Sequence, residues 1–130
     1  MVNYTISDFI AKLNIARRNR LKTLIIRPTK IILELLDSFE RLGVIRGYIV
    51  NEEQKVEIML RYHRSKCAFT HFIVTSKPSR RIYVDMLGLR RFKEKYSSDV
   101  LLLSTSKGLM FDHNCQKENV GGLLLLRISV

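Results

Sequence analysis

The sequence is poor in the residues that form disulfide frameworks and zinc sites. It has two cysteines, Cys67 and Cys115, which stand far apart without a C-x-x-C spacing, and only three histidines. Structural zinc sites need cysteine and histidine ligands at short spacings, and disulfide frameworks need paired cysteines. We therefore expect no metal and no other cofactor, and two free thiols in a reducing compartment.

Long hydrophobic runs are also absent. The longest, such as LLLL at 123–126, fall far short of the roughly 20 apolar residues that span a bilayer. A basic domain lying on an anionic membrane would need an exposed amphipathic face, whereas the apolar stripes of this chain are expected in the core. We expect no membrane partner, and no pattern indicates a small-molecule substrate.

Acidic residues are scarce and unevenly distributed along the chain. The 130 residues include 12 Asp and Glu against 23 Lys and Arg, which gives a formal net charge of +11. No acidic residue occurs between Glu57 and Asp85. A run of charge is usually a solvated face, but so long an acid-free window in a strand-rich segment favours a phosphate-binding surface. Nucleic acid is the first partner to consider. The window contains Arg61, Arg64, Lys66, Lys77, Arg80 and Arg81.

An amphipathic helix is predicted over residues 5–20. We expect Thr5 or Ser7 to cap its start and Asp8 to lie in the first turn, where the helix dipole favours an anion. Arginines crowd its other end. One apolar stripe at helical spacing carries the prediction: Ile6, Phe9, Ile10, Leu13 and Ala16.

The rest of the first half predicts a strand, a helix and a hairpin. LKTLIIRP is typical of a short strand. Thr29 is expected to cap the next helix, and Gly43 to take the left-handed position just past its end. VIRGYIV and KVEIMLRY then alternate like a half-buried hairpin joined by NEEQ. The predicted order for residues 1–65 is α-β-α-β-β.

The second half is predicted to consist mainly of strands. FTHFIVTS, RRIYVD, VLLLSTS, GLMF and GGLLLLRISV are the strand candidates, and DHNCQKENV predicts one short helix with Asp112 at its N-cap. The polar HRSKCA marks the boundary. We therefore expect an α+β fold of two small modules, an N-terminal α/β module at 1–65 and a C-terminal RNA-binding module at 66–130. The second module should be mainly antiparallel sheet with a short helix.

A polar stretch, STSKG at 104–108, interrupts an apolar run and contains S-x-x-K. In serine acyltransferases with this spacing, the serine begins a helix and the lysine faces it one turn later. The flanks VLLL and GLMF are strand-like, so residues three apart would point to opposite faces. No S-D-N or K-T-G accompanies the motif. A serine hydrolase or acyltransferase using Ser104 or Ser106 is the disfavoured alternative, and we expect no enzyme.

The same hydroxyls suit RNA. Short Ser and Thr side chains donate to and accept from sugar hydroxyls, phosphates and base edges. Lys107 would add a phosphate contact, and Gly108 lets another backbone approach closely. From the residues alone, a plain hairpin turn and a contact site are equally open.

The segment SKPSRRIYV at 76–84 is the second candidate for RNA contact. Pro78 stiffens a turn between Lys77 and Arg80, and Tyr83 could stack on an unpaired base. Tyr83 as an ordinary strand residue is the equally open alternative.

These motifs together resemble a known family. SKP…RIYV, STSKGLM and VGG before a final strand are similar to the eighth protein of the small ribosomal subunit, and DFIAKLNIARRN and PTKIILELLDSFERLGVIRGY extend the match over essentially the whole chain. The resemblance implies two packed α/β modules and an early-assembly structural role without catalysis. It also implies binding to an irregular helix in the central domain of small-subunit ribosomal RNA, with ribosomal protein S-five as a neighbour.

The resemblance also implies which residues contact the RNA. A second and weaker contact in the first module would be made by Arg18, Asn19 and Lys30. The main contact would comprise Ser104, Thr105, Ser106, Lys107, Gly108, Lys77, Pro78 and Tyr83, with the glycine pair Gly121 and Gly122.

The chain departs from the family pattern at several points. Ser79 replaces the glycine of the usual K-P-G turn, and Leu123 replaces an acidic residue after the glycine pair. FDHNCQKEN has lost the usual Thr-Asp start, and YSSD stands where glycines precede the STSKG strand. Such drift favours an organellar protein of the mitochondrial ribosome in the matrix. With no leader before the first helix, we expect it to be encoded inside the organelle; a bacterial cytoplasmic origin is the alternative.

Overall fold

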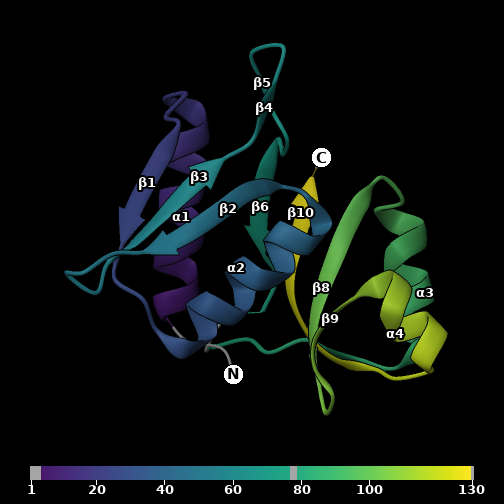
Figure 1. Ribbon diagram of the computed structural model, residues 1–130. Helices are drawn as coiled ribbons and strands as arrows, with labels where there is room; N and C mark the ends of the chain where they lie inside the picture. Colours follow the sequence, from purple (N-terminus) through teal and green to yellow (C-terminus); the bar gives the residue numbers. More distant parts are fainter. Residues whose placement is uncertain (1–3, 77–78, 130) are drawn as a thin grey trace.

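The first half of the chain forms two helices and a three-stranded antiparallel sheet (Figure 1). The computed structural model describes residues 4–76 and 79–129. The strands lie in the order β1-β3-β2, and the predicted α-β-α-β-β order is confirmed. The elements are α1 (Tyr4–Arg18), β1 (Thr23–Ile26), α2 (Lys30–Leu42), β2 (Ile45–Val50) and β3 (Val56–Leu60).

The apolar stripes and the caps of α2 are confirmed. All five stripe residues of α1 are buried, and alternate residues of β3 face the same core. At the start of α2 the Thr29 Oγ1 accepts a hydrogen bond from the Ile32 N–H at 3.3 Å. Gly43 ends the helix with φ +89°, a conformation that glycine adopts without a steric penalty.

The predicted start of α1 was wrong. The helix already includes Tyr4, so Thr5 and Ser7 lie within it and Asp8 lies beyond the first turn. The reason is that an apolar stripe identifies the buried face of a helix but not the turn at which the helix begins.

The second half of the chain is built on a larger antiparallel sheet (Figure 1). Its strands lie in the order β6-β10-β8-β9, and β7 pairs with the beginning of β10. All five predicted strands are present. The elements are β6 (His71–Val74), β7 (Tyr83–Val84), α3 (Met86–Lys95), β8 (Asp99–Thr105), β9 (Gly108–Phe111), α4 (Asp112–Glu118) and β10 (Gly122–Ser129).

Three features of this half differ from the prediction. The helix α3 was not predicted, and the boundary segment HRSKCA lies in a small hairpin of β4 (Tyr62–His63) and β5 (Lys66–Cys67). Asp112 is not the cap of α4, which is preceded by Phe111. Its buried carboxylate instead accepts from the Leu101 N–H at 3.3 Å and pairs with the Lys93 ammonium at 3.2 Å. These partners hold Asp112 inside the first turn.

Both faces of the larger sheet are covered. In β8, Leu102 faces a large apolar cluster that includes α1 and α2, whereas Leu101 and Leu103 face a smaller cluster with Leu89 of α3 and Cys115 of α4. The larger cluster draws on residues from both halves of the chain, and the division into modules at 1–65 and 66–130 stays a prediction. Within the described ranges, no helix is both long and apolar enough to cross a membrane.

We predict that Thr29→Ala lowers the free energy of unfolding by about 1 kcal/mol, because the substitution leaves the Ile32 N–H without its capping acceptor. Urea unfolding measures this change. Thr5→Ala is the matched control: Thr5 is an exposed residue within α1, and alanine favours the helix. Equal losses in the two variants would contradict the assigned cap.

Candidate nucleic-acid interface

The STSKG segment is a tight hairpin turn between β8 and β9. Thr105 pairs with Gly108 across the hairpin, so Ser106 and Lys107 form the turn. The Thr105 Oγ1 accepts from the Lys107 N–H at 3.1 Å and lies 2.9 Å from the Gly108 carbonyl oxygen, to which it donates. Gly108 has φ +100°, in the region that favours glycine. Thr105 therefore has a structural role in closing this turn.

The two turn residues carry the exposed side chains of the motif. Ser106 and Lys107 are exposed, while Ser104 and Thr105 are half-buried. The Lys107 ammonium lies 2.9 Å from a carboxylate oxygen of Glu118 at the end of α4. Both side chains are about half exposed, and such surface ion pairs typically contribute less than about 1 kcal/mol. A phosphate could therefore displace Glu118 at a modest free-energy cost.

The glycine pair lies between this hairpin and β7. A Cβ at Gly121 would lie 2.3 Å from the Val84 carbonyl oxygen, and one at Gly122 would lie 2.4 Å from the Ser104 carbonyl oxygen. Because these contacts are to backbone atoms, no side-chain movement can relieve them. The two glycines allow β10 to begin directly between the backbones of β7 and β8.

This packing brings Tyr83 to the hairpin. Leu123 of β10 is paired with Tyr83 on one side and with Ser104 on the other. The Tyr83 side chain is 69% exposed, so its ring is not used in the core. The structure thus places a free aromatic ring and the hydroxyl-bearing hairpin on opposite sides of one strand of the same sheet.

The loop before β7 is held by a serine that the sequence did not single out. Ser76 is buried; its hydroxyl accepts from the Ile82 N–H at 3.0 Å and donates to the Leu124 carbonyl oxygen. Arg80 is exposed in this loop. Lys77 and Pro78 lie outside the described residues. Ser76 therefore anchors both ends of the loop to β10.

The three predicted contact residues of the first module are separated. Lys30, the first residue of α2, lines a groove that also includes Ser104 and Gly108 of the hairpin. Arg18 and Asn19 lie at the end of α1, at the opposite end of the molecule from the β8–β9 turn (Figure 1). Lys30 therefore belongs spatially with the hairpin, and Arg18 and Asn19 do not.

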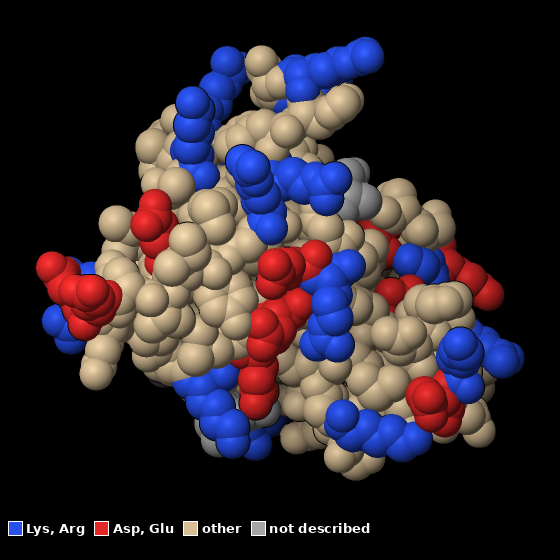
Figure 2. Space-filling view, in the orientation of Figure 1, with Lys and Arg blue, Asp and Glu red and all other residues tan. Residues whose placement is uncertain are grey.

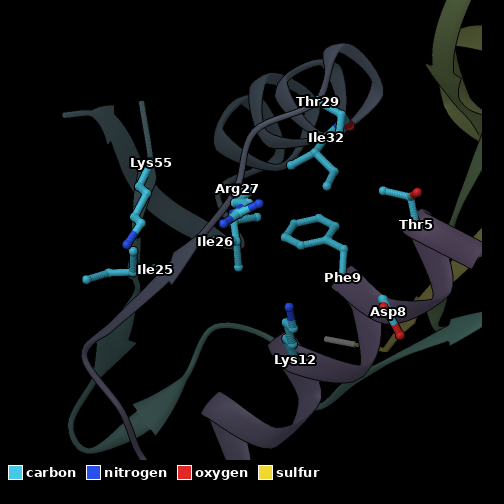
Figure 3. A pocket seen from close by; sticks show the side chains of 10 residues that line it. All are labelled: Thr5, Asp8, Phe9, Lys12, Ile25, Ile26, Arg27, Thr29, Ile32 and Lys55. Atoms are coloured by element: carbon cyan, nitrogen blue, oxygen red, sulfur yellow. The ribbon is translucent and has the colours of Figure 1, made fainter. Parts of the chain in front are cut away.

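A second hollow lies beside this groove, between α1, β1 and the start of α2. Figure 3 shows the Phe9 ring directed towards Ile32, with Lys12 on its other side. Thr5 and Thr29 line both this hollow and the Lys30 groove. The hollow contains no predicted contact residue; its apolar floor is part of the core, since Phe9 is buried.

The described residues hold no metal-binding cluster, and the lysine of S-x-x-K has a carboxylate partner. No group of three or more His, Cys, Asp or Glu among them could hold a metal ion. The Lys107 ammonium pairs with Glu118 rather than with a serine hydroxyl. Cys67 and Cys115 are free, and burial, with a smaller contribution from Asp112, raises the pKa of the Cys115 thiol.

Comparison with known proteins identifies the family. The family model described as Ribosomal protein S8 matches residues 4–129. The chain belongs to the ribosomal protein S8 family. The predicted family is confirmed, and so is the prediction of a structural ribosomal protein that is not an enzyme.

Relatives in this family carry the names uS8m and uS8 of the small ribosomal subunit. Small ribosomal subunit protein uS8m of Acanthamoeba castellanii is 32% identical over 124 residues, covering 95% of this chain and 98% of the relative. Small ribosomal subunit protein uS8 of Campylobacter lari is 33% identical over 132 residues, covering 98% and 99%. The uS8 protein of Brucella anthropi is 35% identical over 132 residues, covering 95% and 98%. Membership of the S8 family implies ribosomal RNA and other ribosomal proteins as partners.

We predict that Gly122→Ala destabilises the protein by about 1–3 kcal/mol, because its methyl group would overlap the Ser104 carbonyl oxygen and force the strands apart. Chemical denaturation measures the loss. Gly47→Ala is the matched control, since a Cβ there would meet only side-chain atoms at 3.4 Å or more. A Gly122 variant as stable as the Gly47 variant would disprove the close strand contact.

Proposed function

We propose that the chain binds an irregular helix in the central domain of small-subunit ribosomal RNA through the β8–β9 turn and its neighbours. The observation that carries this proposal is the exposure of Ser106 and Lys107 at a rigid turn, on the sheet that also presents the Tyr83 ring. Small hydroxyls can reach sugar and base edges, and an exposed aromatic ring can stack on an unpaired base. A regular duplex would offer no base for that ring.

The contact residues of this proposal fall into two classes. Thr105, Gly108, Gly121 and Gly122 hold the backbone geometry, as their hydrogen bonds and close contacts indicate. The side chains left to meet RNA come from the turn, the groove and the loop before β7: Ser104, Ser106, Lys107, Lys30, Arg80 and Tyr83, with Lys77 and Pro78 proposed from the resemblance alone.

The proposed site in the cell is the small subunit of the mitochondrial ribosome, with ribosomal protein S-five as a neighbour. The support is the drift from the family pattern at Ser79 and Leu123, together with the similarity to a protein named uS8m. The uS8 proteins of the bacteria Campylobacter lari and Brucella anthropi are equally similar, so a bacterial ribosome is the alternative. Fractionation of the source cells, followed by detection of the chain in isolated mitochondrial small subunits, tests this assignment.

The RNA proposal is tested by filter binding to a central-domain ribosomal RNA fragment at several salt concentrations. We expect tighter binding to this fragment than to a regular duplex of equal length, and equal affinity for the two would contradict the proposal. Ser106→Ala should weaken binding to the fragment with little change in the salt dependence, because a neutral hydroxyl displaces no counterions.

A second prediction separates the charge of the turn from its hydroxyls. Lys107→Ala should reduce the slope of log affinity against log salt by about one unit or less, since the lysine neutralises at most one phosphate and must first leave Glu118. Glu118→Gln should strengthen binding at low salt, because it removes the competing anion. Lys55→Ala is the control: this exposed lysine also pairs with a glutamate, Glu53 at 3.8 Å, and it should leave the slope unchanged.

A further inference from the structure

A cluster of cations lies at the end of the molecule opposite the β8–β9 turn. Figure 2 shows Lys and Arg side chains gathered at the top of the view, over the end that carries the β4–β5 hairpin in Figure 1. These cations line two grooves, with three cations in the first groove and four in the second. We call these residues the basic end: Lys22, Arg46 and Arg61 in the first groove, and Arg17, Arg18, Arg20 and Lys66 in the second.

The two grooves share one tyrosine. Tyr62, the first residue of β4, lines both of them. Its hydroxyl donates to the Leu21 carbonyl oxygen at 2.6 Å, which ties the start of the β4–β5 hairpin to the loop after α1. Tyr62 and the hairpin that follows it therefore border both cationic grooves.

The hairpin itself is held in a defined shape. Arg64 and Ser65 at its tip have φ values of +52° and +67°, and His63 pairs with Lys66 across it. Two left-handed residues at the centre of a two-residue turn match the twist of a hairpin. Arg64 is exposed at that tip, so it adds a cation at the end of the hairpin.

The cations of the basic end have no anionic partner among the described residues. Neither groove includes an acidic residue in its lining, and the ion pairs of the described chain involve other lysines and arginines. Cations clustered in this way repel one another, and a polyanion removes that cost. The arrangement contrasts with the β8–β9 turn, where Lys107 already has Glu118.

We propose that the basic end is a second RNA-binding surface that holds duplex RNA across its minor groove. An A-form helix has a wide, shallow minor groove with a phosphodiester backbone on each side. In this proposal Tyr62 and the β4–β5 hairpin would lie over that groove, and each cationic groove would contact one backbone. This inference rests on the proposed function in that the ligand is RNA, but it concerns a different surface and a regular helix.

The test uses the full chain and a 20-base-pair RNA duplex of mixed sequence. Lys22→Gln/Arg46→Gln removes two charges from one groove, and Arg18→Gln/Lys66→Gln removes two from the other. Each double variant should reduce the salt slope for the duplex by about two units, because two phosphates are no longer neutralised by the protein. Arg90→Gln/Arg91→Gln removes the same charge from exposed positions on α3 and should leave the slope unchanged.

The possible outcomes separate this surface from its alternatives. Equal effects of the groove and α3 variants would show diffuse charge attraction and overturn the proposal. Equal affinity for B-form DNA of the same sequence would overturn the minor-groove arrangement, and groove-dependent binding to anionic lipid vesicles without binding to the duplex would identify a membrane surface instead.

The same measurements keep the two proposals distinguishable. If Ser106→Ala leaves binding to the central-domain fragment unchanged while the groove variants still weaken duplex binding, the turn proposal fails and the basic end stands. If the groove variants bind the duplex like the unmodified chain while Ser106→Ala weakens fragment binding, the basic end fails and the turn proposal stands.

Discussion

At Gly121 and Gly122 the β10 backbone lies directly against the backbones of β7 and β8, with no room for a side chain between them. Strand pairing then continues from this point along both neighbours of β10, so the position of Tyr83 relative to the β8–β9 turn is fixed by main-chain contacts. Main-chain contacts of this kind leave little freedom for side chains to rearrange. The candidate interface is therefore pre-organised, which lowers the entropy cost of binding.

The leucine run at 123–126 shows how the same strand organises the core. All four side chains are buried; Leu124 faces the smaller apolar cluster and the other three face the larger one. A register shift between Leu124 and Leu126 accommodates this uneven distribution. A strand covered on both faces is continuously apolar rather than alternating, so the run that resembles a short membrane segment in composition is a central strand of a sheet.

The sequence allowed us to predict helices and strands whose signal lies within the element itself. It did not allow us to predict features that depend on hydrogen bonds or ion pairs with distant segments. Stripes, alternation and the Thr29 cap predicted two helices and all the main strands. The helix α3 was missed because only Leu89 is buried in it, which leaves no apolar stripe; its one local signal was Asp85, whose carboxylate accepts from the Gly88 N–H at 2.7 Å. Asp112 was misassigned because its partners, Leu101 and Lys93, belong to other elements. The basic end combines three separate stretches, at 17–22, 46 and 61–66, and no short window of sequence contains it.

The two candidate surfaces differ in how electrostatics would act on them. At the β8–β9 turn a phosphate must replace Glu118, so Lys107 exchanges one ion pair for another and salt screens both. The net electrostatic contribution to the binding free energy is then small. The Ser106 hydroxyl and the Tyr83 ring must therefore distinguish one RNA structure from another. At the basic end no carboxylate is displaced, and the full counterion release contributes to affinity without regard to base sequence. A protein with both would be attracted to RNA in general through one end and would recognise a particular distorted helix through the other.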